Sequence, residues 1–372
     1  MSNAGNAQTT AKQKAKVKTG NKGEWSELYV LLRLLADGNI YAMDNNMQKD
    51  ENTCSPILKI IRHESNGNVV EYKLNKKKVV RVLVNGAEIR QLDRAYLKDA
   101  ADLIYSGIKN NAGSAFDISG TEEILKNLCC SNIKASSHIK TDIEMQVHDI
   151  KTGQPSMEKY SIKSMLGNPP TLMNASKSTN FKYSITGLST LDVDRINSID
   201  TRSKIKDRIS EIKKLGQLTF VSVVNETFKN NLLFIDSMME SILGHVLLIY
   251  YDEGIVTSSA LSTRIDDINP LNYKQTGLYR YKIKKFLCAV ALGLMPSLEW
   301  NGQDETSGGY IILSKDGNLL VYHLFNRDDF ENYLLNNTKL ETASSSKHDF
   351  GTIYYENGNM YINLNLQVRF FN

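Results

Sequence analysis

Acidic, hydroxyl and lysine side chains recur at alternating positions in one stretch of this sequence. Asp142 and Glu144 alternate with apolar residues, and Ser161 and Lys163 do the same further along the chain. Alternate residues of a β-strand point to the same face, so this spacing predicts two amphipathic strands joined by a turn near Gly153. If the two polar faces coincide, Asp142 and Lys163 lie across from each other.

A carboxylate beside a lysine suits the hydrolysis of a phosphodiester bond. The carboxylate can hold Mg²⁺ against the scissile phosphate, where the ion neutralises charge and activates water. Lys163 can orient or activate that water, and the main-chain carbonyl of Ile162 offers one more oxygen ligand. The same alternation also fits an ordinary amphipathic hairpin whose polar face is solvated.

The stretch that begins near residue 24 has helical spacing. Trp25, Leu28 and Leu32 recur as on one face of a helix, and Gly38 suits its C-terminal cap. Glu27 lies in the first turn, where a carboxylate is favourable to the helix dipole. The alternative is that Glu27 points at the hairpin and contributes to a metal site.

The remaining elements alternate between strand-rich and helical segments. Strands are predicted over residues 56–92 and in the last section, where Asp316-Gly317 and Asn357-Gly358 are hairpin turns. Pro169-Pro170 before Thr171 predicts a short helix. Further helices are predicted at about 93–109, after Thr121, within 189–215, as one long helix at about 225–248, and at 261–268 and 279–294.

Composition places this chain of 372 residues among globular proteins. Its hydrophobic content is 41% and its formal charge is +4, which permits nucleic-acid binding without demonstrating it. No C-x-x-C pair occurs among the four cysteines, no signal peptide is recognisable, and the longest apolar run is too short for a bilayer. These features predict a cytoplasmic protein with no membrane partner.

Several familiar catalytic motifs do not occur in the sequence. It contains no G-x-G-x-x-G, no Walker-type P-loop, no H-E-x-x-H and no G-x-S-x-G. The six histidines are scattered without ligand spacing. Nucleotide-dependent, zinc-peptidase and serine-hydrolase chemistries therefore have no support here.

Five stretches together resemble the HpaII family of type II restriction endonucleases. The resemblance covers nearly the whole chain apart from a basic tail, and it rests on residues 21–38, 133–143, 161–181, 336–351 and 364–370. It implies the PD-(D/E)xK nuclease fold, an α/β fold with a mixed central sheet flanked by helices, together with a helical and a β-rich C-terminal part. It also implies Mg²⁺-dependent cleavage of double-stranded DNA at CCGG, 5′-phosphate and 3′-hydroxyl ends, and a companion methyltransferase.

Carried onto this sequence, the resemblance assigns catalytic roles within the hairpin. Asp142 becomes the metal-binding acid and Lys163 the lysine of the signature, with the Ile162 carbonyl as a possible further ligand. The position that usually carries a second acid is Ser161, which we group with the catalytic residues. Another metal ligand must then come from elsewhere, and the candidates, in order of preference, are Glu27, Glu144 and Asn174.

Two polar segments are the expected DNA contacts. The segment 171–180 is expected to grip phosphates through Asn174, Ser176, Lys177, Thr179 and Asn180. The loop 342–350 is expected to read base edges through Ser345, Ser346, Lys347 and His348. A polar loop with capping roles is the alternative for the first segment.

The domain prediction follows from these assignments. It comprises a disordered basic tail at 1–22, a nuclease core at 23–190, a mainly helical subdomain at 191–300 and a β-rich, DNA-contacting part at 301–372. Two other hypotheses stay open at this point. One is a DNA-binding relative that does not cleave, because Ser161 replaces an acid, and the other is a structural protein whose hairpin polarity is incidental.

Overall fold

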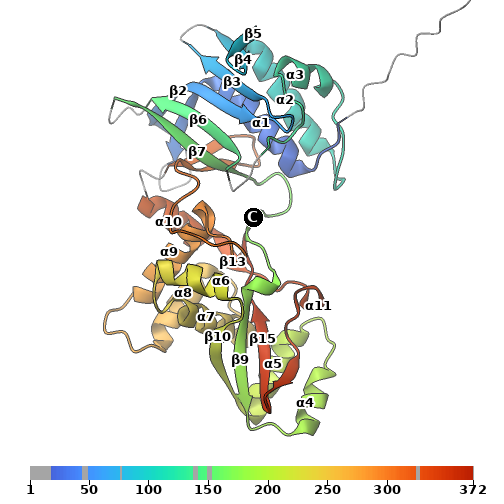
Figure 1. Ribbon diagram of the computed structural model, residues 1–372, viewed down its shortest axis with the longest axis vertical. Coiled ribbons are helices and arrows are strands. Elements are labelled where there is room, and N and C mark those ends of the chain that lie inside the picture. The colour runs from blue at the N-terminus through green and yellow to red at the C-terminus, as the bar shows by residue number, and fades with distance from the viewer. Residues whose placement is uncertain are drawn as a thin grey trace, which may run out of the picture.

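The computed structural model describes residues 18–43, 49–75, 78–136, 141–148, 153–323 and 327–371. Figure 1 shows two parts stacked along the long axis of the molecule, an upper part built on a large sheet and a lower part rich in helices. The predicted tail falls mostly on residues 1–17, outside the described ranges. Within the described part of that predicted tail, Gly20 exchanges two main-chain hydrogen bonds with Phe116.

A large mixed sheet forms the upper part. Among the described residues it has nine strands, in the order β1-β12-β11-β7-β6-β2-β3-β4-β5, and β7–β11 and β1–β12 are its parallel pairs. The strands are β1 (Asn39–Met43), β2 (Lys49–His63), β3 (Val69–Leu74), β4 (Val79–Val84), β5 (Ala87–Asp93), β6 (Ile143–His148), β7 (Pro155–Ser164), β11 (Gly309–Leu313) and β12 (Leu319–His323). The expectation of a mixed α/β protein with a central sheet is confirmed.

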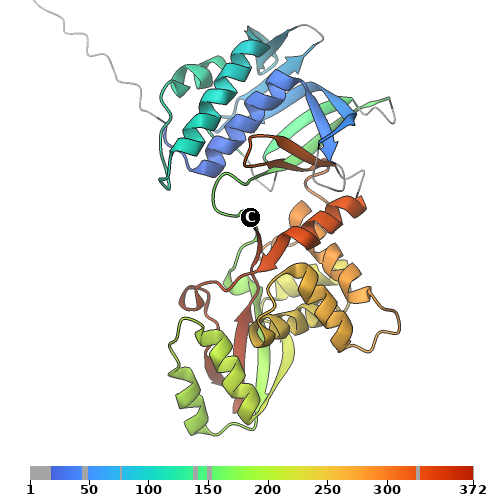
Figure 2. The same ribbon diagram turned by 180° about the vertical axis from the view of Figure 1, so that it is seen from behind.

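Helices cover one face of this sheet. They are α1 (Lys22–Asp37), α2 (Arg94–Asn110) and α3 (Thr121–Asn127), and Figure 2 shows α1 and α2 side by side across the sheet. Asn21 and Glu24 form a capping box at the start of α1, and Gly38 ends the helix with φ of 71°. The buried apolar stripe of α1 therefore packs into the upper core, as its spacing predicted.

The lower part combines two small sheets with a group of helices. One sheet has the order β10-β9-β15-β14 and the other β13-β16-β8. These strands are β8 (Thr171–Met173), β9 (Asn180–Thr186), β10 (Gln217–Val223), β13 (Thr338–Leu340), β14 (Ile353–Glu356), β15 (Asn359–Asn365) and β16 (Val368–Phe370). The helices are α4 (Thr190–Asn197), α5 (Lys204–Leu215), α6 (Glu226–Ile235), α7 (Met239–Glu253), α8 (Ser258–Ile268), α9 (Leu278–Leu292), α10 (Arg327–Asn337) and α11 (Ser345–His348), with a 3₁₀ turn at Lys177–Thr179.

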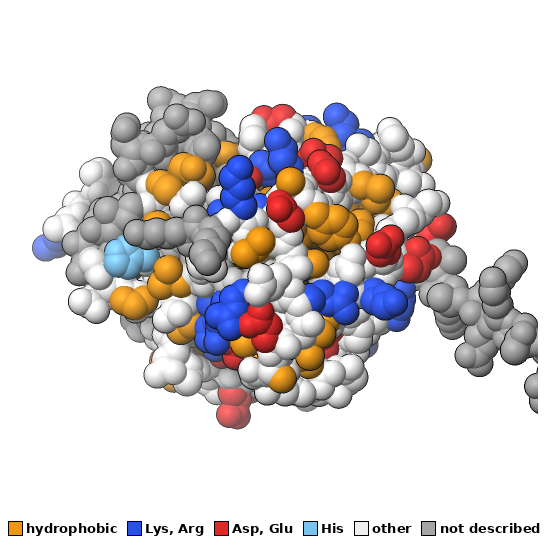
Figure 3. All heavy atoms as spheres, turned by 90° about the horizontal axis from the view of Figure 1, so that it is seen from above, with side chains coloured by type: hydrophobic (Ala, Val, Ile, Leu, Met, Phe, Trp, Pro, Cys, Tyr) orange, Lys and Arg blue, Asp and Glu red, His pale blue; other side chains and the backbone are white. Residues whose placement is uncertain are grey.

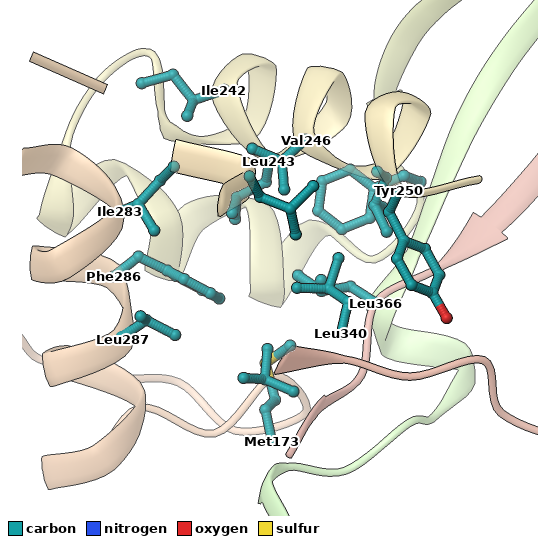
Figure 4. Close-up of a cluster of buried hydrophobic side chains, with 14 of the residues drawn as sticks. Met173, Ile242, Leu243, Val246, Tyr250, Ile283, Phe286, Leu287, Leu340 and Leu366 are labelled. Atoms are coloured by element: carbon teal, nitrogen blue, oxygen red, sulfur yellow. The ribbon is translucent and has the colours of Figure 1, made fainter. Parts of the chain in front are cut away.

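Apolar side chains from distant segments fill the lower core. Figure 4 shows Leu243 and Val246 of α7 facing Phe286 of α9, with Leu340 and Leu366 closing the cluster from the strand side. All five side chains are buried. Residues far apart in the chain therefore hold the lower part together.

Strand β11 belongs to both cores at once. All five of its residues are buried, and side chains of a strand alternate between faces. Tyr310 and Ile312 point into the lower core, whereas Ile311 and Leu313 point into the upper one. This strand is therefore the structural joint between the two parts.

Three sequence-based element predictions are wrong. The long helix at about 225–248 is two helices, α6 and α7, bent by 106° where Asp236 ends the first one. Thr171 opens a strand, β8, because it pairs with β16 instead of following the proline pair into a helix. Helix α10 was not anticipated, since the final section was read as β-rich.

The division of the chain at residues 190 and 300 stays a prediction. Strands β11 and β12 lie beyond the second boundary in sequence, but they pair with β7 and β1 in the central sheet. Among the described residues no single helix is long and apolar enough to cross a membrane; the bent pair α6 and α7 passes that test only when both helices are taken together.

Candidate active site

The predicted hairpin forms and brings its polar residues together. Strands β6 and β7 are antiparallel, with Ile143 opposite Tyr160. Just before β6, Oδ2 of Asp142 accepts hydrogen bonds from the Ser161 hydroxyl at 3.0 Å and from the Ile162 main-chain N–H at 2.7 Å. These two bonds fix the Asp142 carboxylate against β7. The turn that joins the strands lies mainly at residues 149–152, outside the described ranges.

Lys163 lies on the same face of β7 as Ser161. Burial lowers the pKa of Lys163, while the carboxylates of Asp142 and Glu27 act in the opposite direction. Its Nζ atom lies 5.2 Å from the centre of the Tyr310 ring on the adjacent strand β11. The lysine is thus close to both acids, within an enclosure that weakens its hold on a proton.

Helix α1 supplies a second carboxylate. The Glu27 side chain is only 14% exposed, and its Oε2 atom has no hydrogen-bond partner among the described residues. Burial raises the pKa of Glu27 to about 7, and the neighbouring Asp142 carboxylate adds to the rise. Lys134 opposes the rise, with Nζ 3.5 Å from Glu27 Oε1. Two acids and two lysines therefore share one small region.

Two cavities open beside this cluster. One has a volume of about 370 Å³, and its lining includes Asp142, Glu27 and Ile162. The other has a volume of about 850 Å³, and its lining includes Lys163 together with the same Glu27 and Ile162. Glu27 and Ile162 therefore border both cavities, Asp142 borders the smaller one and Lys163 the larger one.

The two less favoured ligand candidates occupy different places. Glu144 lines the smaller cavity, and its Oε2 lies 3.7 Å from His63 Nε2. Asn174 follows β8, is exposed, and is not among the residues that line either cavity. The geometry therefore groups Asp142, Glu27 and Glu144 and leaves Asn174 apart from them.

The donor set fits a hard divalent cation. Mg²⁺ is usually held by one or two carboxylates, with water and phosphate oxygens completing its shell. Asp142 and the unpartnered Oε2 of Glu27 offer two such groups. In the described part of the chain, no cluster of three or more His, Cys, Asp or Glu side chains has a metal-binding arrangement. The Ile162 carbonyl, water and substrate would have to supply the other oxygens.

The two expected DNA-contacting segments adjoin each other in the lower part. The Asn180 side-chain amide donates to the main-chain carbonyl of His348 at 3.0 Å, and Lys177 Nζ lies 3.5 Å from Asp349 Oδ2. Thr179 and Asn180 are buried. Asn180 thus joins the two segments, whereas the Thr179 hydroxyl donates to the Ser176 carbonyl at 3.0 Å within its own segment. Both arrangements support the capping alternative for these two residues. The exposed side chains among those expected to touch DNA are Asn174, Lys177, Ser346 and Lys347.

Charge is mixed at the far end of the upper part. Seen from above in Figure 3, basic side chains are interspersed with acidic ones and with hydrophobic patches. A duplex is attracted most strongly by a continuous basic surface. The visible part of that face therefore gives no support to a DNA contact there.

Sequence reasoning missed a buried network next to the site. Arg62 pairs with Glu64 at 2.6 Å, and both residues line the smaller cavity. Glu64 also accepts a hydrogen bond from the main-chain N–H of Ser131 at 2.6 Å. An alternating charged pair in a strand normally indicates a solvated face, so no local signal pointed to this network. No sequence pattern pointed to a role for Lys134 either, although this residue lies within the stretch 133–143 that carried part of the resemblance.

Comparison with known proteins identifies the class and then the family. No solved structure matches the chain. A family model described as HpaII restriction endonuclease matches residues 21–370. The chain is 41% identical over 357 residues to the type II restriction enzyme HpaII of Haemophilus parainfluenzae, covering 95% of this chain and 98% of the relative. The class is therefore that of the restriction endonucleases, which are site-specific deoxyribonucleases. Within it, the chain belongs to the HpaII restriction endonuclease family.

Proposed function

We propose that this enzyme hydrolyses double-stranded DNA at CCGG in a Mg²⁺-dependent reaction that leaves 5′-phosphate and 3′-hydroxyl ends. Family membership over residues 21–370 supports the activity, and the PD-(D/E)xK fold is part of the same proposal. The observation that carries the chemistry is the meeting of Asp142, Glu27 and Lys163. Glu27 comes from α1 and Lys163 from β7, while Asp142 directly precedes β6. Glu27 lines two cavities, one of which is also lined by Asp142 and the other by Lys163.

Asp142 and Glu27 would hold the metal ion, with the Ile162 carbonyl as a further ligand. When bound, Mg²⁺ supplies charge neutralisation at the scissile phosphate and lowers the pKa of a bound water. Glu144 is the alternative acid, because it lines the same cavity. Ser161 acts through Asp142: its hydroxyl donates to Oδ2 and so fixes the direction of the other carboxylate oxygen.

Lys163 would orient or deprotonate the attacking water. Its lowered pKa means that it holds a proton less tightly than an exposed lysine does, so its amine can accept a hydrogen bond or a proton from water. Asp142 and Glu27 act on the pKa of Lys163 in the opposite direction from burial, and so favour its cationic form after the amine has taken up a proton. One side chain can therefore orient the nucleophile and then stabilise negative charge.

DNA contacts are proposed for the two adjoining segments of the lower part. Lys177 and Asn174 are exposed in the first, and Ser346 and Lys347 in the second. Lysine contacts to phosphate make binding weaken steeply with salt, whereas base-edge contacts confer sequence selection. The partly exposed Ser176, Ser345 and His348 complete the proposed surface, whereas the buried Thr179 and Asn180, which the sequence also placed among the DNA contacts, would hold the segments in position.

The proposed setting is the cytoplasm of a cell that protects its own DNA. An enzyme that cuts a short site would damage the host genome unless that site were modified, which implies a companion methyltransferase for the same sequence. The nuclease core is proposed to lie within residues 23–190, and the later segments are proposed to contact DNA.

Cleavage of defined plasmids tests this proposal. We expect discrete fragments from a plasmid with CCGG sites in the presence of Mg²⁺, and none when the metal is chelated. A matched plasmid from which every CCGG has been removed should stay intact. Ends that a ligase joins without prior phosphorylation would identify 5′-phosphates. Retention of the CCGG plasmid on the protein without any cutting would contradict the proposal, as would fragments that map to other sequences.

A further inference from the structure

The loop that leads from α3 to the hairpin carries a lysine to the candidate metal site. Lys134 Nζ lies 3.5 Å from Oε1 of Glu27. The lysine side chain is 46% exposed, whereas the glutamate side chain is 14% exposed. The ammonium group therefore reaches the carboxylate from the solvent side and leaves the buried Oε2 atom without a hydrogen-bond partner among the residues that the structure describes.

A buried ion pair fixes the approach of this loop. Nη2 of Arg62 donates to the main-chain carbonyls of Asn132 at 2.7 Å and Ile133 at 2.9 Å, immediately before Lys134. On the other side, the N–H of Ser136 donates to the carbonyl of His63 at 2.9 Å. Burying charge is costly unless hydrogen bonds compensate, and the bonds that compensate Arg62 hold the main chain before the lysine. The Ser136–His63 bond holds the main chain after it. The position of Lys134 is thus built into the fold.

The charges around Glu27 leave a specific role for this lysine. The Asp142 carboxylate is close enough to disfavour ionisation of Glu27, so the pair of acids needs a cation. Arg62 is engaged by Glu64 and by the loop carbonyls, and Lys163 is enclosed on the strand side. Lys134 is the cation in ion-pair contact with Glu27 among the described residues, and it has a flexible stem that can withdraw into solvent.

We propose that Lys134 is an exchangeable counter-ion of the metal site. Its ammonium group neutralises Glu27 in the metal-free enzyme and withdraws when a divalent cation takes that carboxylate. The inference rests on the proposed metal site at Asp142 and Glu27. It adds that lysine and metal compete for the same carboxylate, which sets the cation affinity of the enzyme in the absence of DNA.

Binding of Mn²⁺ to the full-length, DNA-free protein tests the competition. Mn²⁺ prefers the same oxygen ligands as Mg²⁺, and its free concentration is measured by electron paramagnetic resonance. In Lys134→Ala we expect Mn²⁺ to bind about fivefold more tightly at roughly pH 8, because a partly exposed ion pair no longer competes. Lys134→Arg retains the competing charge and should bind Mn²⁺ nearly as the wild type does. Lys126→Ala, an exposed lysine on α3, is the matched control and should leave the affinity unchanged.

Asp142→Asn separates the two ways in which the inference can fail. If Asp142→Asn loses Mn²⁺ while Lys134→Ala binds it as the wild type does, or more weakly, the counter-ion role is wrong and the metal site stands. If wild type and Asp142→Asn bind Mn²⁺ equally, the proposed metal site is wrong and the counter-ion role falls with it. Thermal unfolding of each variant without metal establishes that the fold is intact.

Discussion

At the scale of single residues, a serine occupies the position to which the proposed PD-(D/E)xK signature would give an acid. Ser161 is buried and donates its hydroxyl hydrogen bond to Asp142. A carboxylate in its place would face the Asp142 carboxylate without a solvent shell, which is unfavourable. We propose that the second acid is Glu27 on α1, which approaches Asp142 from a different element.

Asp142 and Lys163 are the two hairpin residues for which we propose direct chemical roles. Asp142→Asn retains the hydrogen-bond acceptor but removes the charge, and Lys163→Met retains the stem but removes the amine. We expect each substitution to lower the rate of plasmid cleavage on the order of 10²- to 10⁴-fold while CCGG-duplex binding persists. Lys98→Ala, at an exposed position on α2, is the control and should cut at the wild-type rate. Full activity in either hairpin variant would remove that residue from the site.

Because the pKa of Glu27 is raised in the folded state, the free energy of unfolding depends on pH. In the unfolded chain its carboxyl titrates near 4.5, whereas in the fold its pKa is about 7. The folded state therefore binds this proton more tightly, so the stabilising contribution is complete below 4.5 and is lost as pH rises through about 7. Without metal, raising the pH from about 4 to about 8 should cost wild type about 2–3 kcal/mol of unfolding free energy relative to Glu27→Gln.

Urea unfolding at several pH values, with a chelator present, measures this difference. Glu123→Gln, at an exposed position on α3, provides the matched control and should follow the wild-type profile. Parallel pH profiles for wild type and Glu27→Gln would show that Glu27 does not titrate in this range. The same variant should also lose Mn²⁺ affinity, because an amide is a poorer ligand than a carboxylate.

At the scale of elements, the candidate site depends on how β11 enters the sheet beside β7. Gly308 comes just before β11, and its N–H donates to the Lys159 carbonyl at 2.8 Å. A Cβ atom built on Gly308 would lie 2.5 Å from the Tyr160 ring, which is closer than real contacts allow. Glycine is therefore required here by space, and Tyr160 lies directly before Ser161 in β7.

Gly308→Ala should destabilise the fold by about 1–3 kcal/mol, because the ring or the strand must shift to admit the methyl group. The shift should also slow cleavage, since it displaces the strand that carries Ser161 and Lys163. Chemical denaturation and plasmid cleavage measure the two effects. Gly113→Ala is the control, because its nearest contact would be an ordinary 3.4 Å. Equal stability of both variants would contradict the steric argument.

At the scale of the whole molecule, β11 couples two hydrophobic cores. Tyr310 is buried in the lower core and Ile311 in the upper one, next to each other in the chain. A strand that is buried on both faces cannot leave one core without exposing residues of the other. We infer that the two parts unfold together.

Truncation on either face of β11 tests this coupling. Tyr310→Ala and Ile311→Ala should each lower the midpoint of one shared unfolding transition, at a cost of about 2–5 kcal/mol each. Calorimetry and fluorescence should give coincident transitions for both variants. Two separated transitions, with each variant shifting a different one, would show that the parts unfold independently.

Much of the local structure follows from the sequence alone. The apolar stripe and the cap residues define α1, and Asn85-Gly86 and Asn357-Gly358 adopt the positive φ angles that tight hairpin turns require. Alternation in the hairpin placed Asp142 and Ser161 on a common face. These features depend on side chains a few residues apart, so a local pattern is enough to predict them.

Local patterns in the sequence therefore predicted the hairpin, and the family resemblance predicted the mixed α/β class; the acid of the hairpin lies across from Ser161. Only the tertiary structure decided that β11, far along the chain, lies between β7 and β12, and that Lys134 and the Arg62–Glu64 pair adjoin Glu27. Such contacts arise because distant segments bury complementary apolar surfaces together. The free energy of these long-range contacts depends on the whole packed core, so residue spacing within a short stretch cannot predict them.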